Sequence, residues 1–138
     1  MQPIYQTIHE PLNGNCFQAC VASIFELPLD AVPHFMENCA GHKWTQEQWD
    51  AVLKFAEDHG RRAFWVDWPE EPEFCKMLAE SDLHYIAIGK SKAGDWGHCV
   101  VMHKGKLAHD PSRSFGLDSE PWTYVGFEVT GGTLTERE

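Results

Sequence analysis

The feature that most restricts the fold is the segment after Asn15, which is apolar on nearly every side. Its apolar residues are Cys16, Phe17, Ala19, Cys20, Val21, Ala22, Ile24 and Phe25. We predict a helix from Cys16 to about Glu26, with Asn15 as its N-cap, because an asparagine side chain can accept from an unpaired backbone N–H. A helix without a polar face must be covered by other elements over most of its surface.

Two more helices are predicted downstream. Thr45-Gln46-Glu47-Gln48 matches a capping box. The residues that follow at helical spacing are Trp49, Val52, Leu53 and Ala56, which indicates an amphipathic helix ending near Gly60. Pro72 is typical of a first helical position. It opens a third helix with Phe74, Met77 and Leu78 on one face.

The second half of the chain favours strands, because short apolar runs alternate there with turn residues. The predicted strands are Ala63–Asp67, Tyr85–Ile88, Gly97–Met102, Lys106–His109 and Trp122–Val129. Helices come first and strands dominate afterwards. This order predicts an α+β fold with an antiparallel sheet, against which the buried N-terminal helix packs.

Length and charge restrict the function classes. The 138 residues are expected to form one domain, 1–138. The net charge is -10, and no basic run exists that could neutralise phosphates, so we expect no nucleic-acid partner. No apolar stretch reaches the roughly 18 residues of a membrane span, and the N-terminus lacks the pattern of a signal peptide. The odd count of five cysteines favours reduced thiols in the cytoplasm.

Cys16 is the candidate nucleophile. A cysteine attacks as a thiolate, and the first turn of a helix lowers the thiol pKa through the helix dipole and free N–H groups. The alternative is a cysteine that only packs as a small hydrophobe. Cys20, one turn later, is expected to pack. The preceding Asn13-Gly14 supplies an amide and a flexible backbone, so Asn13 is the candidate side chain of an oxyanion hole, although an ordinary Asn-Gly turn explains it equally.

His98 is the candidate base, and Asp110 the residue that orients it. His98 begins a predicted strand, and Asp110 follows the returning strand. A three-residue loop ending in a left-handed Gly105 would place His98 directly opposite Asp110. A two-residue turn at Lys104-Gly105 would send the two side chains to opposite faces of the sheet. The sequence allows both turns, and the role of Asp110 depends on the three-residue loop, which makes its pairing with His98 geometrically natural.

The order of a helix-borne Cys, a strand His and an Asp-Pro after a hairpin resembles the papain-like cysteine peptidases. The stretches His98-Cys99-Val100-Val101 and His109-Asp110-Pro111 are similar to those of bacterial double-glycine peptidases. Asn13-Gly14-Asn15-Cys16 resembles the nucleophile loop of ovarian-tumour-type deubiquitinases. The resemblance covers under a third of the chain. Many papain-like enzymes have a Gln six residues before the Cys, where this chain has Glu10, and Gln6 lies further upstream.

The resemblance implies a papain-like fold and hydrolysis of an amide, peptide or isopeptide bond through a thioester on Cys16, with His98 and Asp110 completing the site. The substrate would be a peptide, a protein tail or a small amide, and no cofactor or metal is expected. Trp96 is a candidate wall of the substrate groove, or ordinary packing. Alternatives are an acyltransferase, transglutaminase or deamidase using the same residues, a non-catalytic protein-binding module, and a zinc site including Cys16 and Cys20.

Overall fold

The structure is a computed structural model that describes residues 1–9, 14–36, 44–68, 70–94, 96–113, 116–118 and 120–129. Its centre is an antiparallel sheet of β1 (Arg61–Asp67), β2 (His84–Lys90), β3 (Gly97–His103), β4 (Lys106–His109) and β5 (Thr123–Val129). The strands lie in the order β1-β5-β2-β3-β4. The described helices are α1 (Cys16–Phe25), α2 (Gln46–Asp58) and α3 (Pro72–Glu80), with a short 3₁₀ turn, η1 (Leu29–Ala31). The predicted α+β class with an antiparallel sheet is confirmed.

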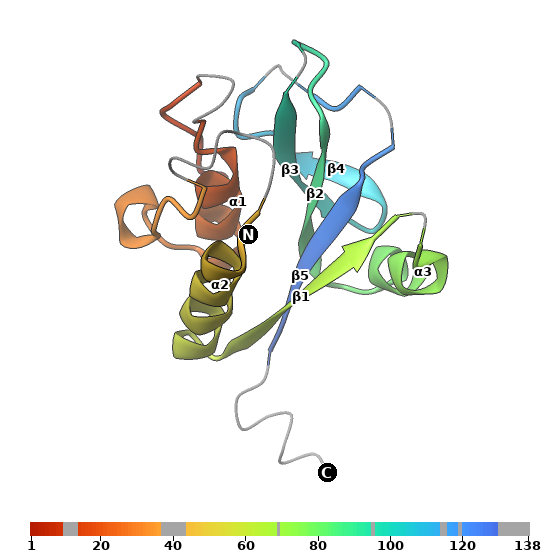
Figure 1. The fold of residues 1–138 in the computed structure, drawn as a ribbon, viewed down its shortest axis with the longest axis horizontal. Coiled ribbons are helices and arrows are strands. Elements are labelled where there is room, and N and C mark those ends of the chain that lie inside the picture. The colour runs from red at the N-terminus through yellow and green to blue at the C-terminus, as the bar shows by residue number, and fades with distance from the viewer. Residues whose placement is uncertain are drawn as a thin grey trace.

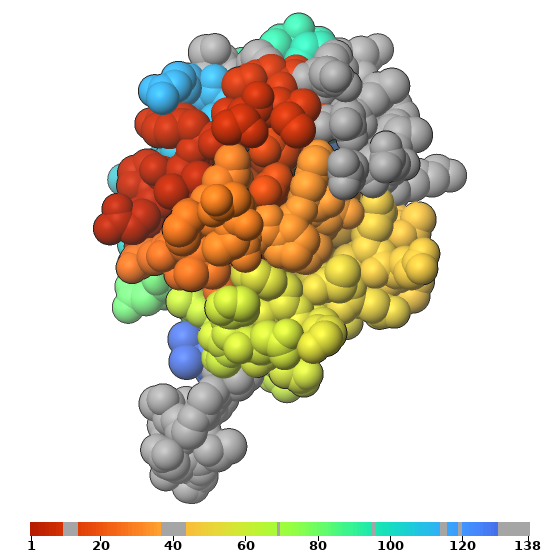
Figure 2. Space-filling model, turned by 90° about the vertical axis from the view of Figure 1, so that its left-hand side faces the viewer, coloured from red at the N-terminus to blue at the C-terminus, as the bar shows by residue number. Residues whose placement is uncertain are grey.

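The helices divide between the two faces of the sheet. α1 and α2 lie together on one face, and α3 lies beside β1 towards the other (Figure 1). Seen from the helical side, α1, η1 and α2 cover most of that face of the sheet (Figure 2). The core lies between these helices and the sheet. It contains residues from α1 and from alternate positions of the strands, among them Val21, Ile86, Val101, Val125 and Phe127.

α1 is buried as its composition predicts. Positions from Phe17 to Ile24 are buried on nearly all sides, and the helix contacts both β3 and β2. Glu26 ends the helix in a left-handed conformation, two residues before Pro28. This mostly apolar helix therefore packs against the middle of the sheet and holds its first residue, Cys16, beside His98 and Cys99 of β3.

α2 begins with the predicted capping box. The Thr45 hydroxyl accepts from the Gln48 N–H at 3.1 Å, and the Gln48 side chain accepts from the Thr45 N–H at 2.9 Å. Val52 and Ala56 form the buried face. Gly60, with a φ of 75°, follows the helix end, where a positive φ favours glycine.

α3 begins at Pro72 as predicted, but the expected apolar face is only partly buried. Leu78 and Cys75 face the sheet, whereas Phe74 is 55% exposed and Met77 is 64% exposed. Phe74, Met77 and Leu78 line an open groove of about 450 Å³ beside β1. The three residues share a side of the helix, as expected, but the sheet covers only Leu78.

The turn between β3 and β4 is the shorter of the two that the sequence allows. Lys104 and Gly105 form a two-residue turn, with φ values of 55° and 77°, and His103 pairs with Lys106. This corresponds to the hairpin turn that requires a positive φ at both central residues. The three-residue loop, with Met102 opposite Lys106, is therefore not formed, and His98 does not lie directly opposite Asp110.

A bulge next to this turn returns His98 and Asp110 to the same face of the hairpin. Met102 pairs with Leu107, but the next residue, Val101, pairs with His109, so the register shifts by one. Continued for one residue, the shifted register brings Asp110 opposite Val100, and Val100 and His98 share a face of β3. His98 and Asp110 therefore meet diagonally across the hairpin rather than directly opposite each other.

No helix within the described ranges is long and apolar enough to cross a membrane.

Candidate active site

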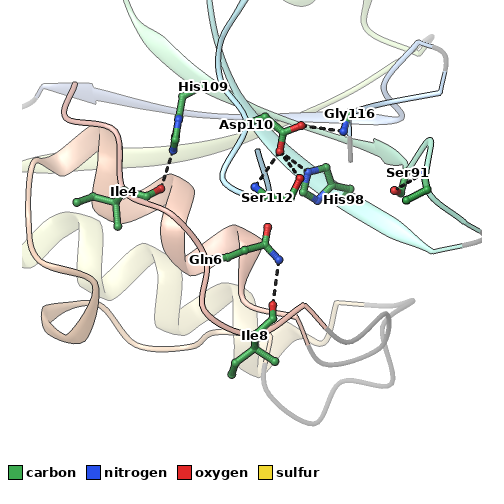
Figure 3. A network of polar contacts seen from close by, with 10 residues as sticks. Ile4, Gln6, Ile8, Ser91, His98, His109, Asp110, Ser112 and Gly116 are labelled. Carbon is green, nitrogen blue, oxygen red and sulfur yellow. Dashed lines mark hydrogen bonds and ion pairs between the residues drawn. The ribbon is translucent and has the colours of Figure 1, made fainter. Parts of the chain in front are cut away.

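The carboxylate of Asp110 is surrounded by donors just beyond the end of β4. Its Oδ1 accepts from His98 Nε2 at 2.8 Å and from the N–H and hydroxyl of Ser112 at 2.9 and 2.7 Å. Its Oδ2 accepts from the Gly116 N–H at 2.7 Å. Figure 3 shows these donors converging on the carboxylate. The arrangement fixes Asp110 as an anion and fixes the imidazole that it contacts.

These contacts change the pKa of both partners. Burial raises the pKa of Asp110, but the hydrogen bonds from His98 and Ser112 outweigh it and hold the pKa well below its usual range. Burial likewise lowers the pKa of His98, but Asp110 and the sulfur of Cys16 raise it to about 9. The His98 side chain is therefore an imidazolium at neutral pH, buried but with an anionic partner on either side.

Cys16 is the first residue of α1 and is half-buried. Its sulfur accepts a hydrogen bond from the Cys99 thiol, another from His98, and one from the Cys99 backbone N–H. These contacts, led by the Cys99 thiol, outweigh burial and lower the pKa of Cys16 to about 5. Since His98 Nε2 is bound to Asp110, its Nδ1 is the ring nitrogen that remains for Cys16. The three predicted residues therefore lie in one chain of contacts.

The pKa values of two other cysteines, Cys20 and Cys75, are shifted in the opposite direction. Burial raises the pKa of Cys20 well above its ordinary value, and it raises that of Cys75 as well. Cys20 packs in the core beneath Cys16, as predicted. The contrast singles out Cys16 as the thiol that ionises at neutral pH.

Asn15 does not act as the predicted side-chain cap. It occupies the N-cap position of α1, but its side chain makes no capping hydrogen bond. Its Oδ1 accepts from the N–H groups of Thr7 and Ile8 at 3.0 and 2.8 Å. Its Nδ2 donates to the Thr7 hydroxyl and to Gln18. The side chain thus holds the N-terminal segment against α1 and leaves the first-turn N–H groups to other acceptors.

The same N-terminal segment runs along the strand end that carries Asp110. The Gln6 N–H donates to the Pro111 carbonyl at 3.0 Å, and a nitrogen of His109 lies 2.6 Å from the Ile4 carbonyl. Both contacts tie residues near the start of the chain to the end of β4, as Figure 3 shows for His109 and Ile4. The segment therefore bridges the helix that holds Cys16 and the hairpin that holds Asp110.

Gln6 is the polar residue of the site that sequence reasoning set aside. Its side chain is buried, and its Nε2 donates to the Ile8 carbonyl at 2.9 Å. Its Oε1 is also buried and has no hydrogen-bond partner. The available signal was a glutamine upstream of the nucleophile, but its spacing from Cys16 differs from the pattern of six residues. Cys99, Ser112 and Gly116 were also missed, because only the folded hairpin brings them to the site.

Two further residues were predicted for the site, Asn13 and Trp96. Asn13, the expected oxyanion-hole side chain, lies outside the described residues. Trp96 is half-buried, and its indole packs directly against Gly94, where an added Cβ would lie 1.8 Å from the ring. This close approach supports the packing interpretation of Trp96 and explains why glycine occupies position 94.

Within the described ranges, no group of three or more His, Cys, Asp or Glu side chains is arranged to hold a metal ion. A comparison with protein-family models gives no match, and neither the curated proteins nor the solved structures include one that matches this chain. The functional argument therefore depends on the geometry of the site.

Proposed function

We propose that this protein is a papain-like cysteine hydrolase that cleaves an amide, peptide or isopeptide bond through a thioester on Cys16. One observation carries the proposal. A thiol with a lowered pKa at a helix N-terminus shares a hydrogen bond with a histidine whose other ring nitrogen is held by a buried carboxylate. Covalent acyl transfer needs a nucleophile in contact with a base, and that base in contact with an orienting group.

The first half of the reaction uses the charges present at neutral pH. The Cys16 thiolate attacks the carbonyl carbon, and the carbonyl oxygen becomes an oxyanion. His98 then donates its proton to the departing amine, which breaks the C–N bond and leaves a thioester. Asp110 keeps the imidazole oriented and stabilises its charged form throughout.

The second half releases the acyl group. His98, now neutral, accepts a proton from water as the water attacks the thioester carbonyl. This proton restores the imidazolium, and collapse of the second oxyanion breaks the C–S bond, expels the Cys16 thiolate and releases the acid product. Water is the acceptor in a hydrolase, whereas an amine acceptor would make the enzyme an acyltransferase.

Two donor groups are suited to the oxyanion. The first-turn N–H groups of α1 are not capped by Asn15, and they lie next to the sulfur by their position in the chain. The Gln6 carboxamide donates one N–H to Ile8 and carries a second N–H on the same nitrogen. Preorganised donors of this kind are worth about 3 kcal/mol each in the transition state.

The proposal is tested first by thiol reactivity. Native protein is treated with iodoacetamide at pH 6, and the modified cysteines are mapped by mass spectrometry over time. A thiol with an ordinary pKa of about 8.5 is less than about 1% ionised at that pH. We therefore expect Cys16 to react at least tenfold faster than Cys75 and Cys20. Equal rates in the folded protein would contradict the proposal.

The second part of the test is turnover of a pool of peptide coumarylamides. Cys16→Ala is expected to abolish release of the fluorophore, and Asp110→Asn to reduce kcat/KM by about 10² to 10⁴. Cys75→Ala and the exposed Asp118→Asn are the matched controls and should retain full activity. Turnover that survives Cys16→Ala would rule the mechanism out. Product analysis with an added amine distinguishes hydrolysis from acyl transfer.

A further inference from the structure

Three tryptophans form a corner where α2 meets β1. The rings of Trp44, Trp49 and Trp65 contact one another edge to face, with centroids 5.4–6.2 Å apart and planes 80–86° apart. Each indole is half-buried, so each also keeps part of its surface open. A hollow of about 180 Å³ lies at the corner and is lined by the three indoles with Thr45 and Gln46.

The corner is connected directly to the helix that carries the nucleophile. The Trp44 ring packs edge to face on Phe17, with centroids 4.8 Å apart. Phe17 is buried and follows Cys16 in α1. An extended peptide advances about 3.3–3.6 Å per residue, so two to four residues span about 7–14 Å. A substrate whose carbonyl lies at Cys16 would use a span of this order to place one of its side chains at the corner.

The size of the hollow suits one side chain. Whole small-molecule sites usually have about 300–1,000 Å³, and this hollow is smaller. Its walls are mainly indole surfaces, and the face of an indole attracts a cation through the ring quadrupole. The geometry thus favours a single long side chain that has an apolar stem and a positive end.

The polar groups around the hollow also favour a positively charged ligand. Trp65 Nε1 donates to Asp67 at 2.7 Å, and Gln46 Nε2 donates to Asp50 at 2.8 Å, so both donors already have carboxylate partners. The capping box occupies the N–H groups of Thr45 and Gln48, which reduces what α2 offers an anion. None of the five described lining residues is basic, and the chain carries a net charge of -10.

We propose that the corner of Trp44, Trp49 and Trp65 is a specificity subsite for the side chain of a lysine or arginine, two to four residues from the carbonyl that Cys16 attacks. The position relative to the scissile bond rests on the proposed function. The preference for a cation does not, because it follows from the indoles and the surrounding carboxylates. The two claims can therefore be tested separately.

The binding test uses a protein that cannot turn over substrate. Cys16→Ala protein is titrated with three acetylated alanine tetrapeptide amides that carry lysine, norleucine or glutamate at one position, each position being tested in turn. Norleucine keeps the length of the lysine stem without its charge. At one position we expect lysine to bind about 2- to 30-fold more tightly than norleucine, and glutamate to bind most weakly. The indole N–H resonance of Trp65 should shift only with the lysine peptide.

Two variants locate the effect. Trp49→Leu removes one indole and should abolish the lysine preference, whereas Phe74→Leu changes an exposed aromatic ring on α3 and should leave it intact. Gln46→Lys places a positive charge at the exposed rim and should abolish the preference with the three indoles in place. This second variant decides the matter if Trp49→Leu does not fold.

Equal responses to lysine and norleucine at every position, including no response to any peptide, would overturn the subsite. A preference that persists in both Trp49→Leu and Gln46→Lys would overturn it as well. If Cys16 reacts as proposed but lysine is not preferred, only the subsite fails. If lysine is preferred but Cys16 is unreactive, the proposed hydrolase fails and the cation site stands.

Discussion

The N-termini of α1 and α2 have the same pattern of capping residues, but only α2 forms the cap. Each helix has a polar N-cap, Asn15 or Thr45, and a glutamine at its third position, Gln18 or Gln48. In α2 the two side chains close on the helix end and form a full capping box. In α1 neither closes on it, and Cys16 occupies the open first turn. One end is arranged for helix stability, and the other leaves donors available next to a thiol.

Tertiary contacts explain the difference. The Gln18 side chain donates to the carbonyls of Leu29 and Val32 around η1, at 3.0 and 2.8 Å. The Asn15 N–H, which a closed capping box would bind, donates to the Ile8 carbonyl at 3.2 Å. Both polar residues of α1 are thus engaged by neighbouring segments, whereas Thr45 and Gln48 each bond to the backbone of the other. The same pair of residue types therefore forms a capping box at α2, while at α1 its side chains bond to other segments.

The largest expected effect is the pH dependence of Cys16 reactivity at the uncapped N-terminus of α1. The pKa of Cys16 is lowered to about 5 and that of His98 is raised to about 9, so the thiolate and imidazolium coexist between these values. Alkylation of Cys16 should fall about tenfold for each pH unit below 5, as the thiol becomes protonated. Turnover should fall again above pH 9, as His98 loses the proton that it gives to the leaving amine.

The measurement is the iodoacetamide rate of Cys16 across the pH range, with Cys75 in the same sample as the internal control. Burial raises the pKa of Cys75, so its rate should still be rising at pH 9. A Cys16 profile with a midpoint near the ordinary thiol pKa of about 8.5 would show that the uncapped end of α1 and its partners do not activate the thiol.

A smaller effect is expected from Asn15→Ala. The substitution removes the acceptor of the Thr7 and Ile8 N–H groups and the contacts of Nδ2, without removing a helix cap. Two backbone donors that lose their partner cost about 2–3 kcal/mol together. We expect the free energy of unfolding in urea to fall by that amount and the Cys16 alkylation rate to fall with it, because the bridging segment loosens. Loss of stability with full retention of Cys16 reactivity would break the link between Asn15 and the site.

The sequence predicted the members of the candidate site better than their geometry. Periodicity and composition are local signals, and they located α1, the capping box of α2 and the β3–β4 hairpin. The hairpin differs from the three-residue loop in two respects that add: the turn has two residues instead of three, and the bulge shifts the register by one more in the same direction. The total shift of two residues keeps His98 and Asp110 on one face but places Asp110 opposite Val100. A bulge at Val101–Met102 leaves no mark in the local pattern, because Ala108 is an ordinary strand residue.

The remaining site residues depend on contacts between distant parts of the chain. Asn15 fits the pattern of an N-cap, and only the docked segment at Thr7 and Ile8 shows why its side chain is used elsewhere. Cys99 has the pattern of a core strand residue, yet its thiol and backbone N–H both reach Cys16. Such roles come from the packing of α1 against β3, which neither spacing nor composition encodes.

The smallest effect is expected at the closed helix end. Thr45→Ala removes an exposed cap that has one helix N–H as its partner, and such a loss costs about 1 kcal/mol. The free energy of unfolding in urea should fall by that amount, while the alkylation rate of Cys16 stays unchanged. That pairing is the inverse of the Asn15→Ala result, in which stability and reactivity fall together. A change in Cys16 reactivity would instead show that the two helix ends are coupled, and the contact between Trp44 and Phe17 is the route by which α2 reaches α1.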